Sequence, residues 1–357
     1  MNSGPLVPLV VRLGPIGDMV QQTPLFHLLH GRYGRPCRLL TAGPASAALF
    51  MGNPDVEEIW SLRKRHAPFL LSPERWRLAF WLRKHRGPIY VSEDSRRQLR
   101  NLRRMFAITG TPSDCCLFID QFPPLGDEHS VDQLLRFGQA TPPAFQSGFS
   151  TQTIDPQTAP RLYVHPGDRK DREAWLRQRG FAGHPLVLLQ PGNKQAIKWR
   201  HARVDDPKAW PVARWAALLH AMHAQLPDAR LLLCGSPAER NLLQEIHTAT
   251  AMDCVEIASD DLPLRRLLAV LETAHSMVSV DSGPAHIAAA IGCPLVVLYG
   301  QASPKRWGRR SPMHSPVIEL GGAPAHRTAS EIPLEAVVEA WMQLHATRTT
   351  DTRINVA

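Results

Sequence analysis

The chain has 357 residues, of which 44% are hydrophobic and 20% charged, and its formal net charge is +9 at pH 7. This length suits two domains of ordinary size, and the composition excludes a disordered or fibrous protein. No apolar run approaches the ~18 residues that a membrane-spanning helix requires. The apolar run at residues 5–11 is short and has no basic leader, so we expect no signal peptide and a cytoplasmic protein.

Six cysteines and sixteen histidines are spread along the chain without a C-x-x-C pair or a Cys/His cluster of zinc-binding spacing. This distribution argues against a zinc knuckle and against a disulfide framework. We therefore expect no metal site, and no motif below requires a cofactor.

Strand and helix patterns alternate in the first half of the chain, which predicts a parallel sheet covered by helices. The expected strands are residues 6–13, 38–41, 56–62, 88–91, 118–122 and 161–164. The expected helices are residues 18–30, 45–51, 73–85, 95–108, 131–138 and 169–179. A Pro/Thr/Gln-rich stretch at 140–160 should be irregular surface chain.

Positive charge is concentrated in residues 61–104, which hold thirteen Lys and Arg residues against three Asp and Glu residues. Such a region indicates an anionic partner, either a phosphorylated glycolipid, an anionic membrane face or nucleic acid. The alternative is a solvated helix face that only aids solubility. No helix-turn-helix, zinc-finger or aromatic RNA-binding signature accompanies the charge, so we do not expect nucleic acid as the partner.

A second alternating series begins at Pro185. Its expected strands are residues 186–190, 230–234, 254–257, 277–280 and 294–299, and its expected helices include 212–225, 238–249, 263–272 and 333–345. The two series predict two Rossmann-like domains, 1–182 and 183–332, followed by the helix 333–345 and a polar tail, 346–357. Because ligands of such sheets bind outside the carboxyl ends of the strands, the turns there should face a common cleft. These turns follow Leu13, Gln190, Cys234, Val280 and Tyr299.

The most informative stretch is residues 277–290, in which a strand runs through Asp281-Ser282-Gly283-Pro284 into an Ala-rich helix. The first N–H groups of a helix lack intrahelical partners and carry partial positive charge, so they bind anions such as phosphate. The alternative is an ordinary turn in which Asp281 or Ser282 caps the helix.

Two acidic residues open predicted helices. Asp18 follows Gly14-Pro15-Ile16-Gly17, and it is either a general base that faces the cleft or a first-turn acid favoured by the helix dipole. Glu239 follows Gly-Ser-Pro-Ala, and it either accepts hydrogen bonds from ribose hydroxyls or is again a first-turn acid. The glycines before Asp18 do not complete G-x-G-x-x-G, so a nicotinamide cofactor is not expected.

The loop at residues 192–210 follows a strand that points into the predicted cleft. It holds five cations, Lys194, Lys198, Arg200, Arg203 and Lys208. Such cations would meet a diphosphate, although a solvated loop would also be basic.

Four segments in order carry a likeness to a known family. They are Leu-Gly-Pro-Ile-Gly-Asp at 13–18, Pro-Gly at 191–192 with Lys-Ala-Trp-Pro at 208–211, Cys-Gly-Ser-Pro-Ala-Glu-Arg at 234–240, and Val-Asp-Ser-Gly-Pro-Ala-His at 280–286. Together they resemble the signatures of glycosyltransferase family nine, the bacterial ADP-heptose:lipopolysaccharide heptosyltransferases. The likeness covers nearly the full length, and the last segment is its most specific part.

The resemblance implies an α/β GT-B fold, in which two Rossmann-like domains with parallel sheets face a central cleft. The first domain would bind the acceptor and the second the nucleotide sugar, and the last helix would cross back to the first domain. The implied reaction is an inverting, metal-independent transfer of heptose from ADP-heptose to an anionic lipopolysaccharide inner-core acceptor. Such a protein would be cytoplasmic and peripheral at the inner membrane.

The resemblance also assigns roles to residues of this chain. Asp18 would be the base that takes the proton from the acceptor hydroxyl. The donor would be bound by Lys208, Ser282 and Gly283 at its diphosphate, Glu239 at its ribose, Leu262 near its adenine, and Asp281 and His286 in the same pocket. Independently of the family motifs, the charge of the segment 61–104 makes Arg63, Lys64 and Arg65 candidates for contact with the acceptor.

Two departures from the family pattern matter. The chain between Gly192 and Lys208 is longer than the usual compact phosphate loop, so Lys194 and Lys198 are additional candidates for binding phosphate. Pro15 stiffens the turn before Asp18. No Asp-x-Asp follows an apolar strand, so cations and helix amides would stabilise the departing diphosphate.

Two other functions are consistent with the same residues. One is a transferase of the same fold that uses another nucleotide sugar in O-antigen or capsule assembly. The other is a non-catalytic module that binds a nucleotide sugar or glycolipid, in which Asp18 is only a helix cap.

Overall fold

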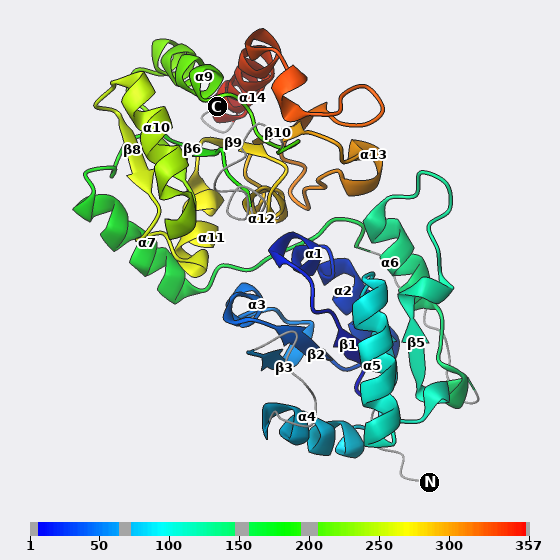
Figure 1. Ribbon diagram of the computed structural model, residues 1–357. Coiled ribbons are helices and arrows are strands. Elements are labelled where there is room, and N and C mark those ends of the chain that lie inside the picture. The colour runs from blue at the N-terminus through cyan, green and yellow to red at the C-terminus, as the bar shows by residue number, and fades with distance from the viewer. Residues whose placement is uncertain (1–5, 64–72, 147–156, 194–205, 355–357) are drawn as a thin grey trace. The chain divides into compact units, whose positions relative to one another are not determined.

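The computed structural model describes residues 6–63, 73–146, 157–193 and 206–354 (Figure 1). Contacts between Cα atoms divide the chain into two units, Met1–Leu162 and Tyr163–Ala357. Each unit is a parallel β-sheet whose strands are connected largely through helices, as predicted. Within the described ranges, no helix is long and apolar enough to cross a membrane.

The first unit contains a five-stranded sheet in the order β3-β2-β1-β4-β5. Its strands are β1 (Leu9–Val11), β2 (Cys37–Ala42), β3 (Val56–Leu62), β4 (Ile89–Val91) and β5 (Cys116–Phe118). Its α-helices are α1 (Ile16–Val20), α2 (Thr23–Tyr33), α3 (Pro44–Leu49), α4 (Pro73–Lys84), α5 (Arg96–Thr109) and α6 (Ser130–Gln139). The chain runs outward from β1 to β3 and then returns to β4 on the other side of β1. Ligands of open parallel sheets bind at such a switch point, here between β1 and β4.

The second unit contains a six-stranded sheet in the order β11-β10-β9-β6-β7-β8. Its strands are β6 (Leu186–Gln190), β7 (Arg230–Cys234), β8 (Val255–Ala258), β9 (Ser276–Val280), β10 (Leu295–Tyr299) and β11 (Val317–Gly321). Its α-helices are α7 (Pro166–Gln178), α9 (Val212–Gln225), α10 (Arg240–Thr250), α11 (Leu264–Thr273), α12 (Gly283–Ile291), α13 (Pro304–Trp307) and α14 (Leu334–Ile354). The switch point of this sheet lies between β6 and β9.

Short 3-10 helices lie in the connections. They are η1 (Ser113–Cys115), η2 (Ile119–Gln121), η3 (Pro143–Phe145), η5 (Pro237–Glu239) and η6 (Ala329–Glu331). The central strands read as continuous apolar runs because both faces of each sheet are covered. All residues of β1 and β9 are accordingly buried.

Three expectations for the first half are wrong. The helix expected at 18–30 is two helices, because Pro24 in the first turn of α2 has no N–H to continue the hydrogen bonding of α1. The Thr23 hydroxyl instead donates to the carbonyl oxygen of Val20 at 2.9 Å. The strand expected at 118–122 is β5 followed by η2, and residues 161–164 form no strand.

The unit boundary at Leu162/Tyr163 precedes the expected boundary at 182/183, because α7 packs on α11 of the second unit. Arg172 Nη1 of α7 donates to the carbonyl oxygen of Ala269 at 3.2 Å, and Arg169 pairs with Glu272 at 2.7 Å. These contacts with α11 place residues 166–178 in the second unit.

The last helix, α14, packs on α9, β9 and β10. Trp341 is buried, and its Nε1 donates to Ser276 Oγ at 2.9 Å. The helix runs to Ile354, past the expected start of a polar tail at 346. The crossing of residues 333–345 to the first unit stays a prediction. β11 was not predicted, because its residues are only half-buried and show no clear alternation.

Candidate functional site

Arg12 and Asp18 lie together at the switch point of the first sheet. Arg12 directly follows β1, and Asp18 is in the first turn of α1. Arg12 Nη2 donates to Asp18 Oδ2 at 2.5 Å, and Arg12 Nη1 donates to the carbonyl oxygen of Ser92 at 2.5 Å. The Arg12 side chain is 5% exposed and that of Asp18 is 28% exposed. The carboxylate is therefore bound by a buried guanidinium and remains accessible to solvent.

Glu93 and Asp94, which follow β4, complete this cluster. Glu93 is fully buried, and its Oε2 accepts from the backbone N of Leu13 at 3.0 Å, which ties the ends of β1 and β4 together. Asp94 Oδ2 accepts from Arg12 Nη2 at 3.2 Å. Burial would lower the pKa of Arg12, but the carboxylates of Asp18, Asp94 and Glu93 outweigh it and raise that pKa. Arg12 therefore presents a permanent positive charge to Asp18.

Gly14 allows Arg12 and Asp18 to meet. A Cβ atom at Gly14 would lie 2.7 Å from Arg12 Nε and 2.9 Å from Asp18 Oδ2, closer than such atoms approach without a shift. The absence of a Cβ atom at Gly14 therefore leaves room for this arrangement of the ion pair. Arg12 was not predicted as a site residue, although a charged residue at the end of a buried strand is the sequence signal that points to it.

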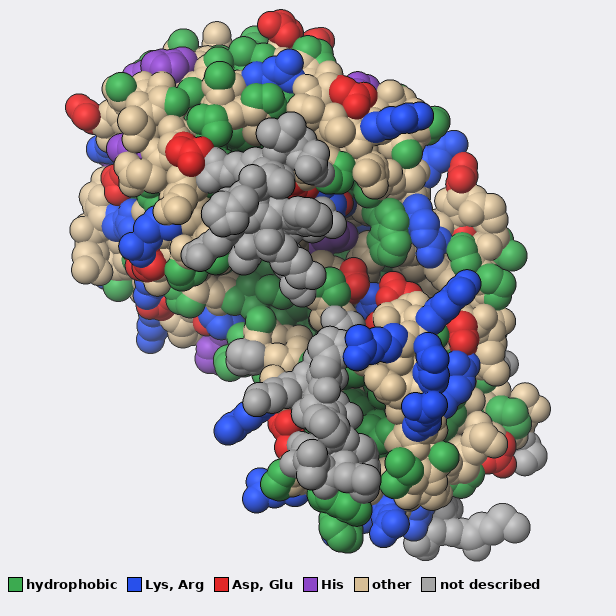
Figure 2. All heavy atoms as spheres, viewed as in Figure 1, with side chains coloured by type: hydrophobic (Ala, Val, Ile, Leu, Met, Phe, Trp, Pro, Cys, Tyr) green, Lys and Arg blue, Asp and Glu red, His purple; other side chains and the backbone are tan. Residues whose placement is uncertain are grey.

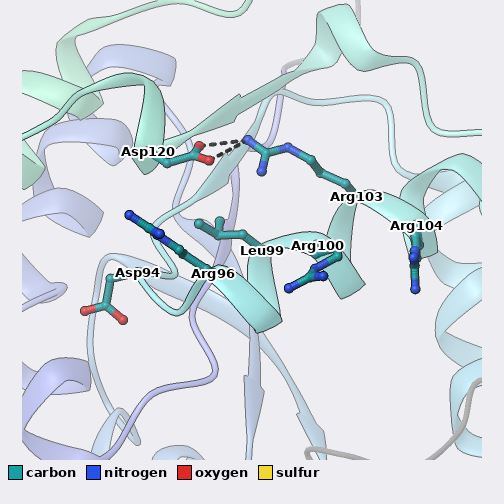
Figure 3. Close-up of a pocket in the computed structure, with 7 residues that line it drawn as sticks. All are labelled: Asp94, Arg96, Leu99, Arg100, Arg103, Arg104 and Asp120. Atoms are coloured by element: carbon teal, nitrogen blue, oxygen red, sulfur yellow. Dashed lines mark hydrogen bonds and ion pairs between the residues drawn. The ribbon is translucent and has the colours of Figure 1, made fainter.

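An open pocket of about 560 Å³ lies beside this cluster (Figure 3). It is lined by Asp94, Arg96, Leu99, Arg100, Arg103, Arg104 and Asp120. Arg103 Nη2 donates to both carboxylate oxygens of Asp120 at 2.8 and 2.9 Å, and its guanidinium lies 4.2 Å from the ring centre of Phe118. Guanidinium groups match the oxygens of phosphates and carboxylates, so the pocket suits an anionic ligand.

The second switch point holds Asp281, which directly follows β9. Its Oδ2 accepts from Lys208 Nζ at 2.6 Å, and its Oδ1 accepts from Arg309 Nη2 at 2.5 Å. Lys208 Nζ also donates to the backbone oxygen of Asp281 at 3.2 Å. The side chain of Arg309 has no exposed area, whereas that of Lys208 is 27% exposed. One carboxylate thus holds an accessible lysine and a buried arginine.

Arg309 belongs to a chain of hydrogen-bonded polar groups that runs from the buried Tyr299 of β10 to the half-buried Glu319 of β11. Its Nη1 donates to Tyr299 Oη at 2.5 Å, and Tyr299 Oη donates to Glu319 Oε1 at 2.8 Å. Burial would raise the pKa of Asp281, but the charges of Arg309 and Lys208 hold it well below its usual range. Arg309 was missed by the sequence analysis, because its loop matches none of the four family segments.

The backbone around Lys208 is fixed by its neighbours. Asp206 is buried, its Oδ1 accepts from the backbone N of Lys208 at 3.0 Å, and its Oδ2 accepts from Asn193 Nδ2 at 3.0 Å. A Cβ atom at Gly300, just after β10, would lie 2.0 Å from the carbonyl oxygen of Pro207. Gly300 therefore permits the close approach that brings Lys208 to the switch point.

Ser282 is the N-cap of α12. Its Oγ accepts from the backbone N of Ala285 at 3.4 Å and lies 2.8 Å from Ser279 Oγ. Gly283 is the first residue of α12, and His286 lies one turn later and is half-buried. The turn is thus a capped helix start at the carboxyl edge of the sheet, which is the geometry required of an anion site.

Glu239 lies at the carboxyl end of β7 and forms a capping box with Ser236. Its Oε2 accepts from the backbone N and the Oγ of Ser236, both at 2.7 Å. Its Oε1 lies 3.4 Å from Gln190 Nε2. A Cβ atom at Gly192 would meet Oε1 at 2.1 Å, so the glycine lets the chain after β6 pass beside this carboxylate. Glu239 therefore caps the first turn through Oε2, and its Oε1 lies beside Gln190 at the end of β6.

For the remaining predicted site residues, the structure gives only burial or a backbone contact, or does not describe the residue. Leu262 is half-buried in the turn between β8 and α11, and the exposed Arg63 donates its backbone N to Glu74 Oε1 at 2.9 Å. The other four lie outside the described residues, namely Lys64, Arg65, Lys194 and Lys198. Among the described residues, no group of three or more His, Cys, Asp or Glu side chains is arranged to hold a metal ion.

The fold is shared with solved glycosyltransferase structures. A glycosyl transferase family 9 structure from Veillonella parvula aligns with a TM-score of 0.72 at 16% identity, over 96% of this chain and 98% of that one. The Escherichia coli ADP-heptose lps heptosyltransferase II aligns with a TM-score of 0.69 at 19% identity, over 96% of this chain and 100% of that one. The Escherichia coli heptosyltransferase WaaC with ADP has a TM-score of 0.63 at 16% identity, over 95% and 100%. The predicted fold class, an α/β fold of GT-B type with two Rossmann-like units, is confirmed.

Residues 152–330 match the model of glycosyltransferase family 9 (heptosyltransferase), and the chain belongs to this family. Among curated relatives, it is 28% identical over 141 residues to lipopolysaccharide heptosyltransferase 3 of Escherichia coli, over 38% of each chain. It is 31% identical over 129 residues to lipopolysaccharide heptosyltransferase 1 of Salmonella typhimurium, over 35% of this chain and 38% of the relative. The matches thus span well under half the length of these relatives.

Proposed function

We propose that this protein transfers a heptose from ADP-heptose to an anionic inner-core acceptor of lipopolysaccharide, with inversion at the anomeric carbon. The observation that carries the proposal is Asp18, a partly exposed carboxylate held by buried Arg12 next to an arginine-lined pocket. Such a carboxylate can take a proton from a hydroxyl whose neighbouring anionic groups are bound by the arginines. The family's relatives, which carry heptosyltransferase names, support the choice of sugar.

In the proposed reaction, the acceptor hydroxyl attacks the anomeric carbon from the face opposite the diphosphate. Asp18 takes the hydroxyl proton as the new C–O bond forms. The bond from the anomeric carbon to the diphosphate oxygen breaks, and ADP leaves with the electron pair. The charge that develops on the diphosphate must be stabilised by cations and amides aimed at it.

The second switch point supplies the groups for this stabilisation. Lys208 Nζ, which rests on Asp281, would turn to the diphosphate, and the N-terminus of α12 at Ser282 and Gly283 would offer backbone amides. Glu239 would face the ribose, Leu262 the adenine and His286 the donor phosphate or sugar. ADP is proposed as the nucleotide because the similar WaaC structure was solved with ADP.

The acceptor would lie in the first unit, at the arginine-lined pocket of α5, whose arginines belong to the basic segment 61–104. Because such an acceptor is a lipid, the protein would work in the cytoplasm as a peripheral protein of the inner membrane. Nucleic acid is not among the proposed partners.

Product analysis with ADP-heptose and defined truncated core acceptors tests the proposal. Heptose added with inverted configuration is the expected result, and an Asp18→Asn variant should lose about 10²–10⁴-fold in transfer while it still binds ADP. Near wild-type transfer by this variant would refute the base assignment. A preference for UDP- or GDP-sugars in thermal-shift experiments would instead favour another nucleotide sugar, and binding without turnover would favour a non-catalytic module.

A further inference from the structure

The outer face of α4 exposes two large aromatic side chains. Leu78 and Leu82 of this helix are buried in the core of the first unit. Trp76 and Phe80 point the other way and are 43% and 61% exposed. Because residues four apart are neighbours on a helix surface, these two rings form one apolar strip. The strip is separate from the residues that line the α5 pocket.

Exposed cations lie beside this strip and at its carboxyl end. Arg77, Arg83 and Lys84 lie on α4 itself, and all three are exposed. The one described acid of the helix is Glu74, whose Oε1 accepts from the backbone N of Arg63 at 2.9 Å. Exposed aromatic side chains beside Lys and Arg form a surface of the composition that binds at a membrane interface, where rings enter the headgroup region and cations meet lipid phosphates.

The surface continues onto the end of α5. Arg83 Nε of α4 donates to the carbonyl oxygen of Thr109 at 3.3 Å, which joins the carboxyl ends of the two helices. Ile108, the residue before Thr109, is 53% exposed. Figure 2 shows Lys and Arg side chains gathered over α5, the helix whose arginines line the pocket, so the basic surface of this unit is not confined to α4. We call the surface formed by Trp76, Arg77, Phe80, Arg83, Lys84 and Ile108 the α4 face.

We propose that the α4 face docks on the surface of an anionic phospholipid bilayer. Trp76, Phe80 and Ile108 would enter the headgroup region, and Arg77, Arg83 and Lys84 would bind lipid phosphates. Charge complementarity selects this partner over a second copy of the chain, because a symmetric contact would place these cations against one another. The inference rests on the proposed function in one respect, that the acceptor is a membrane lipid.

Vesicle co-sedimentation of the full chain tests the proposal. The wild-type protein should sediment with vesicles of phosphatidylglycerol and phosphatidylcholine in equal parts, and much less with phosphatidylcholine alone. A Trp76→Ala/Phe80→Ala variant should bind at least about tenfold more weakly, because two buried rings are lost. The matched control is Leu125→Ala/Met313→Ala, whose side chains are 64% and 63% exposed elsewhere, and it should bind as the wild type does.

A second pair of variants tests the charges. Arg77→Gln/Lys84→Gln should weaken binding roughly 25-fold, about fivefold for each cation removed. Lys170→Gln/Arg177→Gln, which removes two exposed cations from α7, should leave it unchanged. Equal binding by all variants, or no preference of the wild type for anionic vesicles, would overturn the proposal. So would concentration-dependent dimers that disappear in Trp76→Ala/Phe80→Ala, since the face would then be a self-interface.

Transfer to a soluble, delipidated core oligosaccharide separates this inference from the proposed function. The α4 variants should retain that transfer, because none of the changed residues belongs to the candidate site. If the wild type transfers no sugar from any donor while the α4 variants lose vesicle binding, the proposed membrane contact is supported and the proposed function is refuted.

Discussion

Arg309 donates its Nη2 to Oδ1 of Asp281 at 2.5 Å, and its side chain has no exposed area. The same carboxylate binds the accessible Lys208 through its other oxygen at 2.6 Å. If Lys208 binds the donor diphosphate as proposed, Arg309 would keep the Asp281 charge paired when the lysine moves away. Such a buried partner would lower the energetic cost of that movement.

Replacing Arg309 by Met should lower both stability and nucleotide affinity. Removing one partner of a buried ion pair costs about 3–5 kcal/mol in the free energy of unfolding. Asp281 would also hold Lys208 more tightly, so the Kd for ADP should rise. Urea denaturation and ADP titration measure the two effects. Arg327→Met removes an exposed arginine of the same unit and should change stability by no more than about 0.5 kcal/mol; equal behaviour of the two variants would contradict this prediction.

Gly14→Ala should reduce transfer while the protein still folds. The added Cβ would lie 2.7 Å from Arg12 Nε and 2.9 Å from Asp18 Oδ2, so it would displace the candidate base from its arginine. A fall in kcat of about 10²-fold is expected from such a misplacement. Gly167→Ala is the control, since a Cβ there would be 3.4 Å from His165 Nδ1, an ordinary contact. Unchanged kcat in Gly14→Ala would show that the Arg12–Asp18 pair does not need its present geometry.

Arg96→Gln/Arg100→Gln should raise the KM for the acceptor and leave the KM for ADP-heptose unchanged. Both arginines line the α5 pocket and would bind acceptor phosphates or carboxylates. The effect should weaken at high salt and disappear with acceptors stripped of these groups. Arg97→Gln, an exposed neighbour that does not line the pocket, is the matched control. A rise in donor KM instead would assign the pocket to the nucleotide sugar.

Stability should fall in mild acid because of His85. This histidine is buried and stacks on Trp81 with ring centres 5.9 Å apart, and burial lowers its pKa from 6.5 to about 4. Below pH 6.5 the unfolded state binds a proton at His85 that the folded state does not bind. The contribution of the neutral histidine to the free energy of unfolding is therefore fully present above pH 6.5 and is lost as the pH falls towards 4. The loss should amount to roughly 3 kcal/mol.

Denaturation curves collected across this pH range check the effect. His85→Phe keeps the aromatic stack and should show a flatter pH profile than the wild type. His220→Phe, which changes an exposed histidine of α9, should keep the wild-type slope. Parallel profiles for the wild type and His85→Phe would contradict the assignment.

The expectations that failed share a cause. The helix expected at 18–30 is interrupted before Pro24, and α14 continues to Ile354. In both places the apolar pattern of the segment alone does not determine where the helix ends. β11 pairs with β10 at the edge of the sheet, where half-buried residues leave no clear period. The position of α7 depends on contacts that its arginines make with α11, a helix about one hundred residues later in the chain.

The sequence by itself determined the parallel α/β architecture and singled out Asp18, Lys208, Asp281 and Ser282, because strand periodicity, helix starts and short motifs are local properties. Only the tertiary structure decided which charges meet. Arg12 joins Asp94 across two strands, and Arg309 reaches Asp281 from another loop. The reason is physical: an ion pair depends on side-chain positions in space, and the parallel sheet brings together the ends of strands that are remote in sequence.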